Sequence, residues 1–153
     1  MYIHERMFLM KYQTIQKSKC HCITLCRAAN AITAYYDEGL KGLGISVKQF
    51  SLLLNLHHLE GASTAELADY VNLERSTVTR NLKFLLERGW VCDIAAPGKR
   101  AHCYVVTTAG QNIIAQADKI WERLQEEIQE YLGQENAARM MEIAYRLQDL
   151  QKA

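Results

Sequence analysis

The chain has 153 residues, of which 49% are hydrophobic and 23% charged, which is enough apolar content for a buried core and excludes a disordered tail. Its 18 basic and 17 acidic residues nearly cancel, so attraction to nucleic acid must come from a local patch rather than from the net charge. Five cysteines show no disulfide-framework spacing, and no stretch has the length of a membrane span or the layout of a signal peptide. We therefore expect a cytoplasmic protein with no membrane partner.

Two helices are predicted in the first third of the chain. Apolar residues recur every three or four positions from about Lys19 to Leu40, and a pair of glycines follows. A second helix is expected from about Val47 to His58, with Ser46 as its N-terminal cap and Phe50 turned toward the core.

A helix-turn-helix is predicted between Ser63 and Gly89. Ser63 and Glu66 have the spacing of a capping box, in which each side chain bonds the backbone N–H of the other residue, and an apolar face follows them. Asn72 tolerates turn geometry, and a second helix is expected from Arg75 to Arg88, ended by Gly89.

The second of these helices has one apolar stripe and an opposite face rich in hydroxyls and cations. Short hydroxyls reach phosphates or base edges, and an arginine can bond guanine through two N–H groups. An ordinary solvated helix face is the alternative, because helix-turn-helix patterns produce many false matches. The predicted DNA-binding residues of this face are Arg75, Ser76, Thr77, Thr79, Arg80 and Lys83.

A basic hairpin is predicted after that helix. Alternating apolar residues predict strands at Trp90–Ile94 and Ala101–Val106, joined by a turn that contains Lys99 and Arg100. A narrow minor groove attracts an inserted arginine, so both cations are predicted to contact DNA. Residues 75–102 carry six cations and two acids, a local charge of +4 in a chain of net +1, which favours double-stranded DNA as the partner.

Two more helices are predicted after the hairpin, one from Thr107 or Thr108 to about Leu132 and a last one beyond Gly133. Their apolar stripes are longer than a core of this size can cover. Because symmetric dimers dominate among soluble oligomers, the stripes predict a homodimer. Its two reading helices would then match a near-palindromic operator with half-sites about one helical turn apart.

The sequence resembles the MarR family of bacterial winged-helix transcription regulators. The resemblance lies in residues 66–68, 75–80, 85–91 and 107–110 and in the hairpin cations, and with the flanking helices it extends over roughly residues 20–150. It implies a mainly α fold with a small β-hairpin wing, in which a winged helix-turn-helix (residues 46–107) lies between N- and C-terminal dimerisation helices (residues 1–45 and 108–153). It also implies that Arg100 enters the minor groove, although Gly98 stands where the family commonly has an acidic residue. The residues implied for the major groove are Ser76, Thr77, Thr79 and Arg80.

We therefore predict a DNA-binding regulator, most often a repressor, that is not an enzyme and uses no cofactor. The sequence contains no Gly-rich phosphate loop, H-E-x-x-H or G-x-S-x-G motif. By the resemblance, a small-molecule effector binds near Tyr36 and Phe50, where it would change the separation of the two reading helices. A winged-helix module that contacts only other proteins is the alternative.

Cys22 supports a second hypothesis, thiol-based oxidant sensing. The stretch around it is similar to the organic-hydroperoxide-sensing branch of MarR proteins, whose reactive cysteine falls at Cys22 and one of whose tyrosines falls at Tyr36. The other two tyrosine positions of that branch are Cys26 and Val47 here. The alternative is that Cys22 is a small buried hydrophobe.

A metal site is not predicted. Zinc favours four ligands in a tetrahedron, adjacent residues on one helix point apart, and the sequence has no paired C-x-x-C motif. The residues that a metal site would have to use are Cys20, His21, His57, His58, His102 and Cys103.

Overall fold

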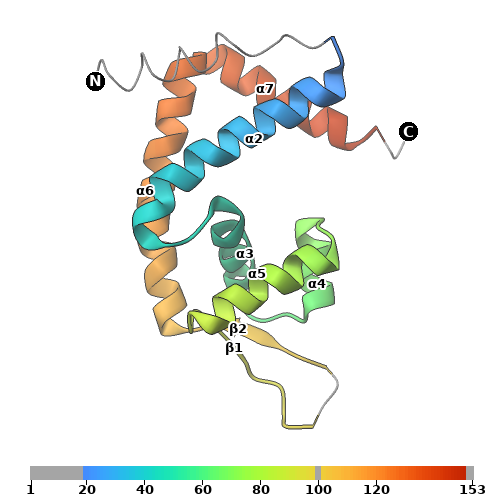
Figure 1. The fold of residues 1–153 in the computed structure, drawn as a ribbon, viewed down its shortest axis with the longest axis vertical. Helices are drawn as coiled ribbons and strands as arrows, with labels where there is room; N and C mark the ends of the chain where they lie inside the picture. Colours follow the sequence, from blue (N-terminus) through green and yellow to red (C-terminus); the bar gives the residue numbers. More distant parts are fainter. Residues whose placement is uncertain (1–18, 99–100, 151–153) are drawn as a thin grey trace. The chain divides into compact units, whose positions relative to one another are not determined.

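A computed structural model of the protein describes residues 19–98 and 101–150 (Figure 1). The chain divides into two compact units, residues 1–35 and residues 36–153. The described part of the first unit, residues 19–35, carries the first turns of helix α2 (His21–Leu40). The second unit holds the end of α2 and all elements after it.

The two predicted N-terminal helices are present. Helix α2 starts two residues later than expected, and it ends at Leu40 as predicted, followed by the 3-10 turn η1 (Lys41–Leu43). Helix α3 (Val47–His58) has the predicted bounds and is capped by Ser46, whose side chain accepts a hydrogen bond from the Gln49 N–H. Its inner face buries Phe50, Leu52, Leu53 and Leu56.

The helix-turn-helix consists of α4 (Thr64–Val71) and α5 (Arg75–Glu87). The Ser63–Glu66 capping box is formed in both directions, and Asn72 ends α4 in the left-handed conformation at φ +52°. Helix α5 ends one residue earlier than predicted, because Arg88 serves as its C-cap and Gly89 turns the chain at φ +69°.

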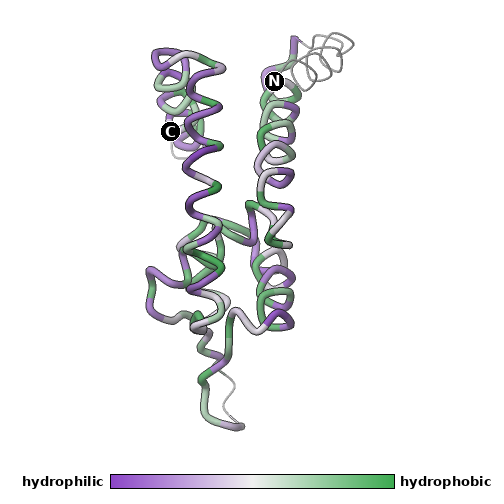
Figure 2. Tube along the Cα trace, turned by 90° about the vertical axis from the view of Figure 1, so that its left-hand side faces the viewer, coloured by the Kyte–Doolittle hydropathy of each residue, from purple (hydrophilic) through white to green (hydrophobic). Residues whose placement is uncertain are grey.

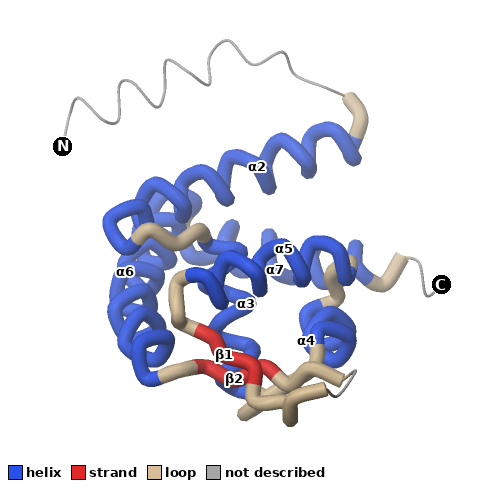
Figure 3. Tube along the Cα trace, turned by 60° about the horizontal axis from the view of Figure 1, so that its bottom comes forward, coloured by secondary structure: helices blue, strands red, loops and turns tan. Residues whose placement is uncertain are grey.

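The wing is an antiparallel hairpin of β1 (Val91–Asp93) and β2 (Tyr104–Val106), with Val91 paired to Val106 and Asp93 to Tyr104 (Figure 3). Both strands are shorter than predicted. Within the described part of the hairpin, the pairing beyond Asp93 continues only as far as the Ile94 N–H, which donates to the Cys103 carbonyl at 2.8 Å. Tyr104 also exchanges two backbone hydrogen bonds with Ala62, so the wing is attached to the loop that precedes α4.

Helix α6 (Thr108–Leu132) begins directly after the wing, and α7 (Gln134–Gln148) follows at Gly133. Thr107 caps α6 and also donates its hydroxyl to the Gly89 carbonyl at 2.7 Å, so one residue joins the end of α5, the wing and α6. Gly110 is required there, because a Cβ atom would lie 2.2 Å from the Trp90 carbonyl oxygen.

The core of the second unit lies between α3, α4, α5, the wing and the first turns of α6. Its fully buried large side chains are Leu40, Leu53, Leu56, Leu67, Leu85 and Val78. Figure 2 shows hydrophobic and hydrophilic residues alternating along the helices, the pattern expected when each helix buries one face. No helix within the described residues is long and apolar enough to cross a membrane.

Candidate nucleic-acid interface

The outer face of α5 is the first part of the candidate interface. The helix is fixed to the core by Val78, Leu82 and Leu85, all buried as the sequence predicted. The opposite face is in solvent, and of the six predicted residues on it only Thr77 is partly buried. The exposed five are Arg75, Ser76, Thr79, Arg80 and Lys83.

The polar groups of this face differ in the partners they already have. The Thr79 hydroxyl donates to the Arg75 carbonyl at 2.8 Å, so its oxygen remains as an acceptor. Lys83 lies 3.9 Å from a Glu87 carboxylate oxygen, an exposed ion pair of the kind that a phosphate can replace. Within the described part of the chain, no ion pair engages the guanidinium groups of Arg75 or Arg80. Two arginines therefore project from the first turns of α5 with their charge uncompensated by a carboxylate.

Arg88 belongs to the structure rather than to the interface. Its guanidinium carbon lies 5.1 Å from the centre of the Phe84 ring and 5.6 Å from that of the Trp90 ring. A cation over two aromatic rings is held in place by their negative faces. Of the cations in residues 75–102, Arg88 therefore packs on the protein's own aromatic rings instead of being free to contact DNA.

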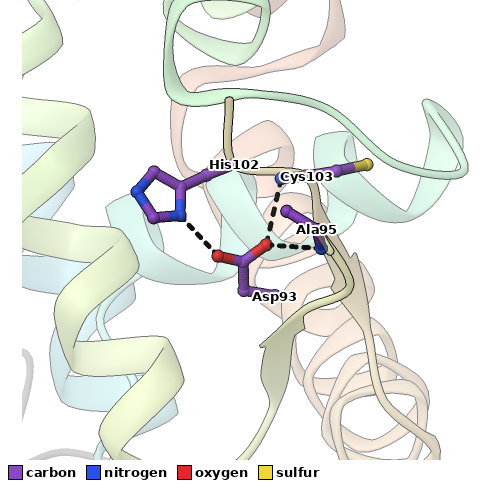
Figure 4. A network of polar contacts seen from close by, with 4 residues as sticks. All are labelled: Asp93, Ala95, His102 and Cys103. Carbon is purple, nitrogen blue, oxygen red and sulfur yellow. Dashed lines mark hydrogen bonds and ion pairs between the residues drawn. The ribbon is translucent and has the colours of Figure 1, made fainter. Parts of the chain in front are cut away.

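The second part of the candidate interface is the wing. Lys99 and Arg100, its predicted DNA-binding cations, lie outside the described residues. The base of the wing is described, and there the Asp93 carboxylate gathers three donors (Figure 4). One oxygen accepts the N–H groups of Ala95 at 2.9 Å and Cys103 at 3.1 Å, and the other lies 2.5 Å from the His102 ring nitrogen Nδ1.

These hydrogen bonds lower the pKa of Asp93, with the Ala95 N–H as the largest cause, followed by the His102 side chain and the Cys103 N–H. The carboxylate is therefore ionised at neutral pH. Sequence reasoning did not find this cluster, because its members come from both arms of a hairpin and only the fold brings them together.

Tyr36 and Phe50, predicted to contact an effector, are both buried. Phe50 is part of the core, and the Tyr36 hydroxyl donates to the Gln125 side-chain oxygen on α6. Burial raises the pKa of Tyr36. A separate surface pocket of about 440 Å³ lies where the end of α3 meets β2 and the start of α6, and it is lined by Leu56, His57, His58, Glu60, Val105, Val106 and Gln111.

Cys22 and Cys26 are exposed in the structure of residues 19–35. A hydrogen bond between their side chains is the largest cause of a raised pKa at Cys26, and the electrostatic effect of Cys22 is the next. The five cysteines, all of them within the described residues, form no disulfide. Across residues 19–98 and 101–150, no three His, Cys, Asp or Glu side chains are grouped as a metal site.

Comparison with known proteins gives matches in sequence and in fold. The profile of the MarR family matches residues 45–92. The transcriptional regulator MOSR of M. tuberculosis, solved in complex with DNA, is 28% identical, with 88% of this chain and 97% of that chain covered at a TM-score of 0.76. Residues 45–92 therefore match the MarR family, and the chain resembles a solved transcriptional regulator along most of its length. The prediction of a mainly α, winged helix-turn-helix fold is confirmed as well, because MarR from E. coli complexed with operator DNA shares the fold at 22% identity and a TM-score of 0.72, over 86% of this chain and 99% of that chain.

A curated relative has a similar sequence. The uncharacterized HTH-type transcriptional regulator YwoH of Bacillus subtilis (strain 168) is 33% identical over 81 residues, which are 53% of this chain. The match spans 59% of the length of YwoH. MarR proteins are transcriptional regulators rather than enzymes.

Proposed function

We propose that this protein is a homodimeric MarR transcription regulator that binds a pseudo-palindromic operator through α5 and the wing and represses the adjoining genes. The observation that carries the proposal is the outer face of α5, where Arg75 and Arg80 project without a carboxylate partner in the described chain beside exposed hydroxyls. A helix held by its opposite face and bearing such groups has the chemistry for reading base edges in a major groove. MOSR, which is similar to this chain over nearly its whole length, has been solved with DNA bound.

Exposed apolar side chains on α7 support the dimer. Ile143 is 53% exposed, and with Leu147 and Leu150 it lines a groove of about 240 Å³. Apolar grooves along a terminal helix are costly in water and are covered when a second copy packs against them. A twofold pair would place the two α5 helices on successive turns of the duplex, about 10 base pairs apart.

A small-molecule effector is part of the proposal. Tyr36 and Phe50 remain its proposed neighbours, and since both are buried in the protomer, an effector there would have to displace core packing or the Tyr36–Gln125 hydrogen bond. Such a displacement would shift α6 relative to α3 and so change the spacing of the reading helices.

Oxidant sensing through Cys22 is the second candidate function. It is favoured by the exposure of the Cys22 thiol and by its hydrogen bond to the neighbouring Cys26 side chain. A hydroperoxide would oxidise the Cys22 thiolate to a sulfenic acid and be reduced to the alcohol.

The main proposal is tested by fluorescence anisotropy with a selected operator and with random duplex at two salt concentrations. Phosphate binding must weaken steeply as salt rises, whereas a module that contacts only proteins would show no binding. We expect Arg80→Ala to lose about 10- to 100-fold in discrimination between operator and random duplex, and Lys99→Ala to weaken both alike.

Lys119→Ala on α6 is the matched control, since it removes one exposed cation outside the candidate interface. Equal loss on operator and random duplex for Arg80→Ala would contradict its role as a base-reading residue.

A further inference from the structure

We propose that Asp93 is a positioning residue for DNA binding: its carboxylate ties the two arms of the wing together at their base, with His102 as its side-chain partner. The inference rests on the proposed function, because it explains how a wing that ends its strand pairing early can still contact DNA in one geometry.

Strand pairing alone does not hold the outer wing. The register of β1 and β2 ends at Asp93 and Tyr104, and one further hydrogen bond, from the Ile94 N–H to the Cys103 carbonyl, is formed beyond it in the described residues. An extended antiparallel pair would next use the Cys103 N–H as a donor to the opposite strand. Here that N–H bonds the Asp93 side chain instead.

Beyond the last strand hydrogen bond, the Asp93 carboxylate joins the two arms of the wing. The same oxygen accepts the N–H of Ala95 on the outgoing arm and of Cys103 on the returning arm, so a single atom links the two arms (Figure 4). The sequence places both wing cations between these two residues. Holding Ala95 and Cys103 on one oxygen fixes the described arms of the wing before DNA binds, which reduces the entropy that binding would otherwise cost.

His102 completes the cluster on the returning arm. Its Nδ1 lies 2.5 Å from the second Asp93 oxygen, and its ring stacks on the Tyr104 ring with centroids 5.8 Å apart and 15° between planes. The ring is therefore held from two sides, by a carboxylate and by an aromatic face.

The sign of the charge makes the role of Asp93 specific. A carboxylate near DNA is repelled by phosphates, so its simple removal would strengthen binding if it did nothing else. Three donors directed at one exposed carboxylate indicate instead that the anion organises the loop. The two opposing expectations allow a direct test.

The test compares Asp93→Ala with Asp93→Asn in two backgrounds, the parent protein and the double variant Lys99→Ala/Arg100→Ala. Anisotropy with random duplex measures affinity and its salt dependence. In the parent background we expect Asp93→Ala to weaken binding about tenfold and to lower the salt slope by about one, the loss of about one phosphate contact. Asp93→Asn keeps an oxygen that accepts both backbone N–H groups and should bind within about threefold of the parent.

In the background that lacks both wing cations, Asp93→Ala should have no further effect, since there is no charge left to position. An equal loss in both backgrounds would mean that Asp93 only supports the fold, and unchanged or tighter binding by Asp93→Ala in the parent would mean that it only repels phosphate. Either result overturns the inference. If the parent binds DNA with salt sensitivity and Asp93→Ala binds with the same affinity, only this inference is overturned. If the parent binds no duplex, the proposed function is overturned as well.

Discussion

Arg80 and Arg88 are eight residues apart in the sequence, but their side chains have different surroundings in the fold. Arg80 projects into solvent from α5, whereas the Arg88 guanidinium rests on the Phe84 and Trp90 rings. Both look like patch cations in the sequence, because the local pattern does not show that the Phe84 and Trp90 rings lie beside the Arg88 guanidinium. The sequence therefore predicts the sign of the surface charge better than the direction in which each cation points.

Other residues show where local pattern stops being informative. The exposed face of α5 follows from helical periodicity, and five of its six predicted residues are exposed. The burial of Phe50 was predicted from helical periodicity and is confirmed. The effector role of Tyr36 and Phe50 came from the resemblance instead, and the Tyr36–Gln125 bond depends on a residue far along the chain. The Asp93 cluster was missed for the same physical reason.

Cys22 allows a prediction at the scale of one thiol. If Cys22 senses oxidant, hydroperoxide should lower operator affinity of the parent by at least about tenfold, and Cys22→Ser should abolish that response. Operator binding is measured by anisotropy before and after treatment. Cys92→Ser, which removes an exposed thiol from the wing, is the control and should respond as the parent does. A Cys22→Ser protein that still releases DNA on oxidation would exclude Cys22 as the sensor.

The helices were the most predictable elements because their start signals are local. Ser46, Ser63 and Thr107 each accept a hydrogen bond from the backbone N–H three residues on. Ser46 and Ser63 were predicted as caps, and at the start of α6 the sequence left Thr107 and Thr108 as alternatives. Strand ends were less predictable. The Cys103 N–H can bond either a strand carbonyl or the Asp93 side chain, and only the folded hairpin decides between them.

The capping box of α4 carries a prediction about stability. Ser63→Ala should lower the free energy of unfolding by about 1 kcal/mol at pH 7, because the Glu66 N–H loses its acceptor. Hydrogen bonds from the Ser63 N–H and hydroxyl lower the pKa of Glu66. A lowered carboxylate pKa stabilises the fold above the ordinary value of ~4.3 and ceases to do so as pH falls through the folded value, so the difference between variant and parent should narrow in acid.

Urea unfolding followed by circular dichroism at pH 7 and at about pH 3.5, at one protein concentration, measures both effects. Ser63→Asn is the control, since asparagine is also a good N-cap and should keep most of the stability. If the stability difference between Ser63→Ala and the parent is the same at both pH values, the Ser63 hydroxyl does not act through Glu66.

At the scale of the whole molecule, the fold and the resemblance to MarR proteins could be predicted, because caps, turns and stripes all agree with one architecture. The three-part division at residues 45 and 107 stays a prediction, and so does the homodimer. Both depend on contacts between chains. A single sequence indicates such contacts only through apolar residues that the core of one chain cannot bury.

The dimer can be tested on α7. Ile143→Lys should raise the dimer dissociation constant by at least about tenfold, because a charge would replace an apolar side chain in the shared groove. Sedimentation velocity over a range of concentrations measures the change, and operator affinity should fall with it. Glu142→Lys places the same side chain at a position that is already charged and should leave assembly intact. A monomeric parent, or a dimer indifferent to Ile143→Lys, would remove this face from the interface.

Helix α6 is a single continuous helix that runs from the wing to α7. It spans 25 residues, about 37 Å at ~1.5 Å per residue, and its first turn is fastened to the wing and to the end of α5 through Thr107 and Gly110. If α6 tilted by about 5° around its C-terminal end, its N-terminal end would move by about 3 Å, which is comparable to the rise of one base pair. A small change in the position of α7 would thus be enough to move α5 and the wing out of register with the grooves of the duplex.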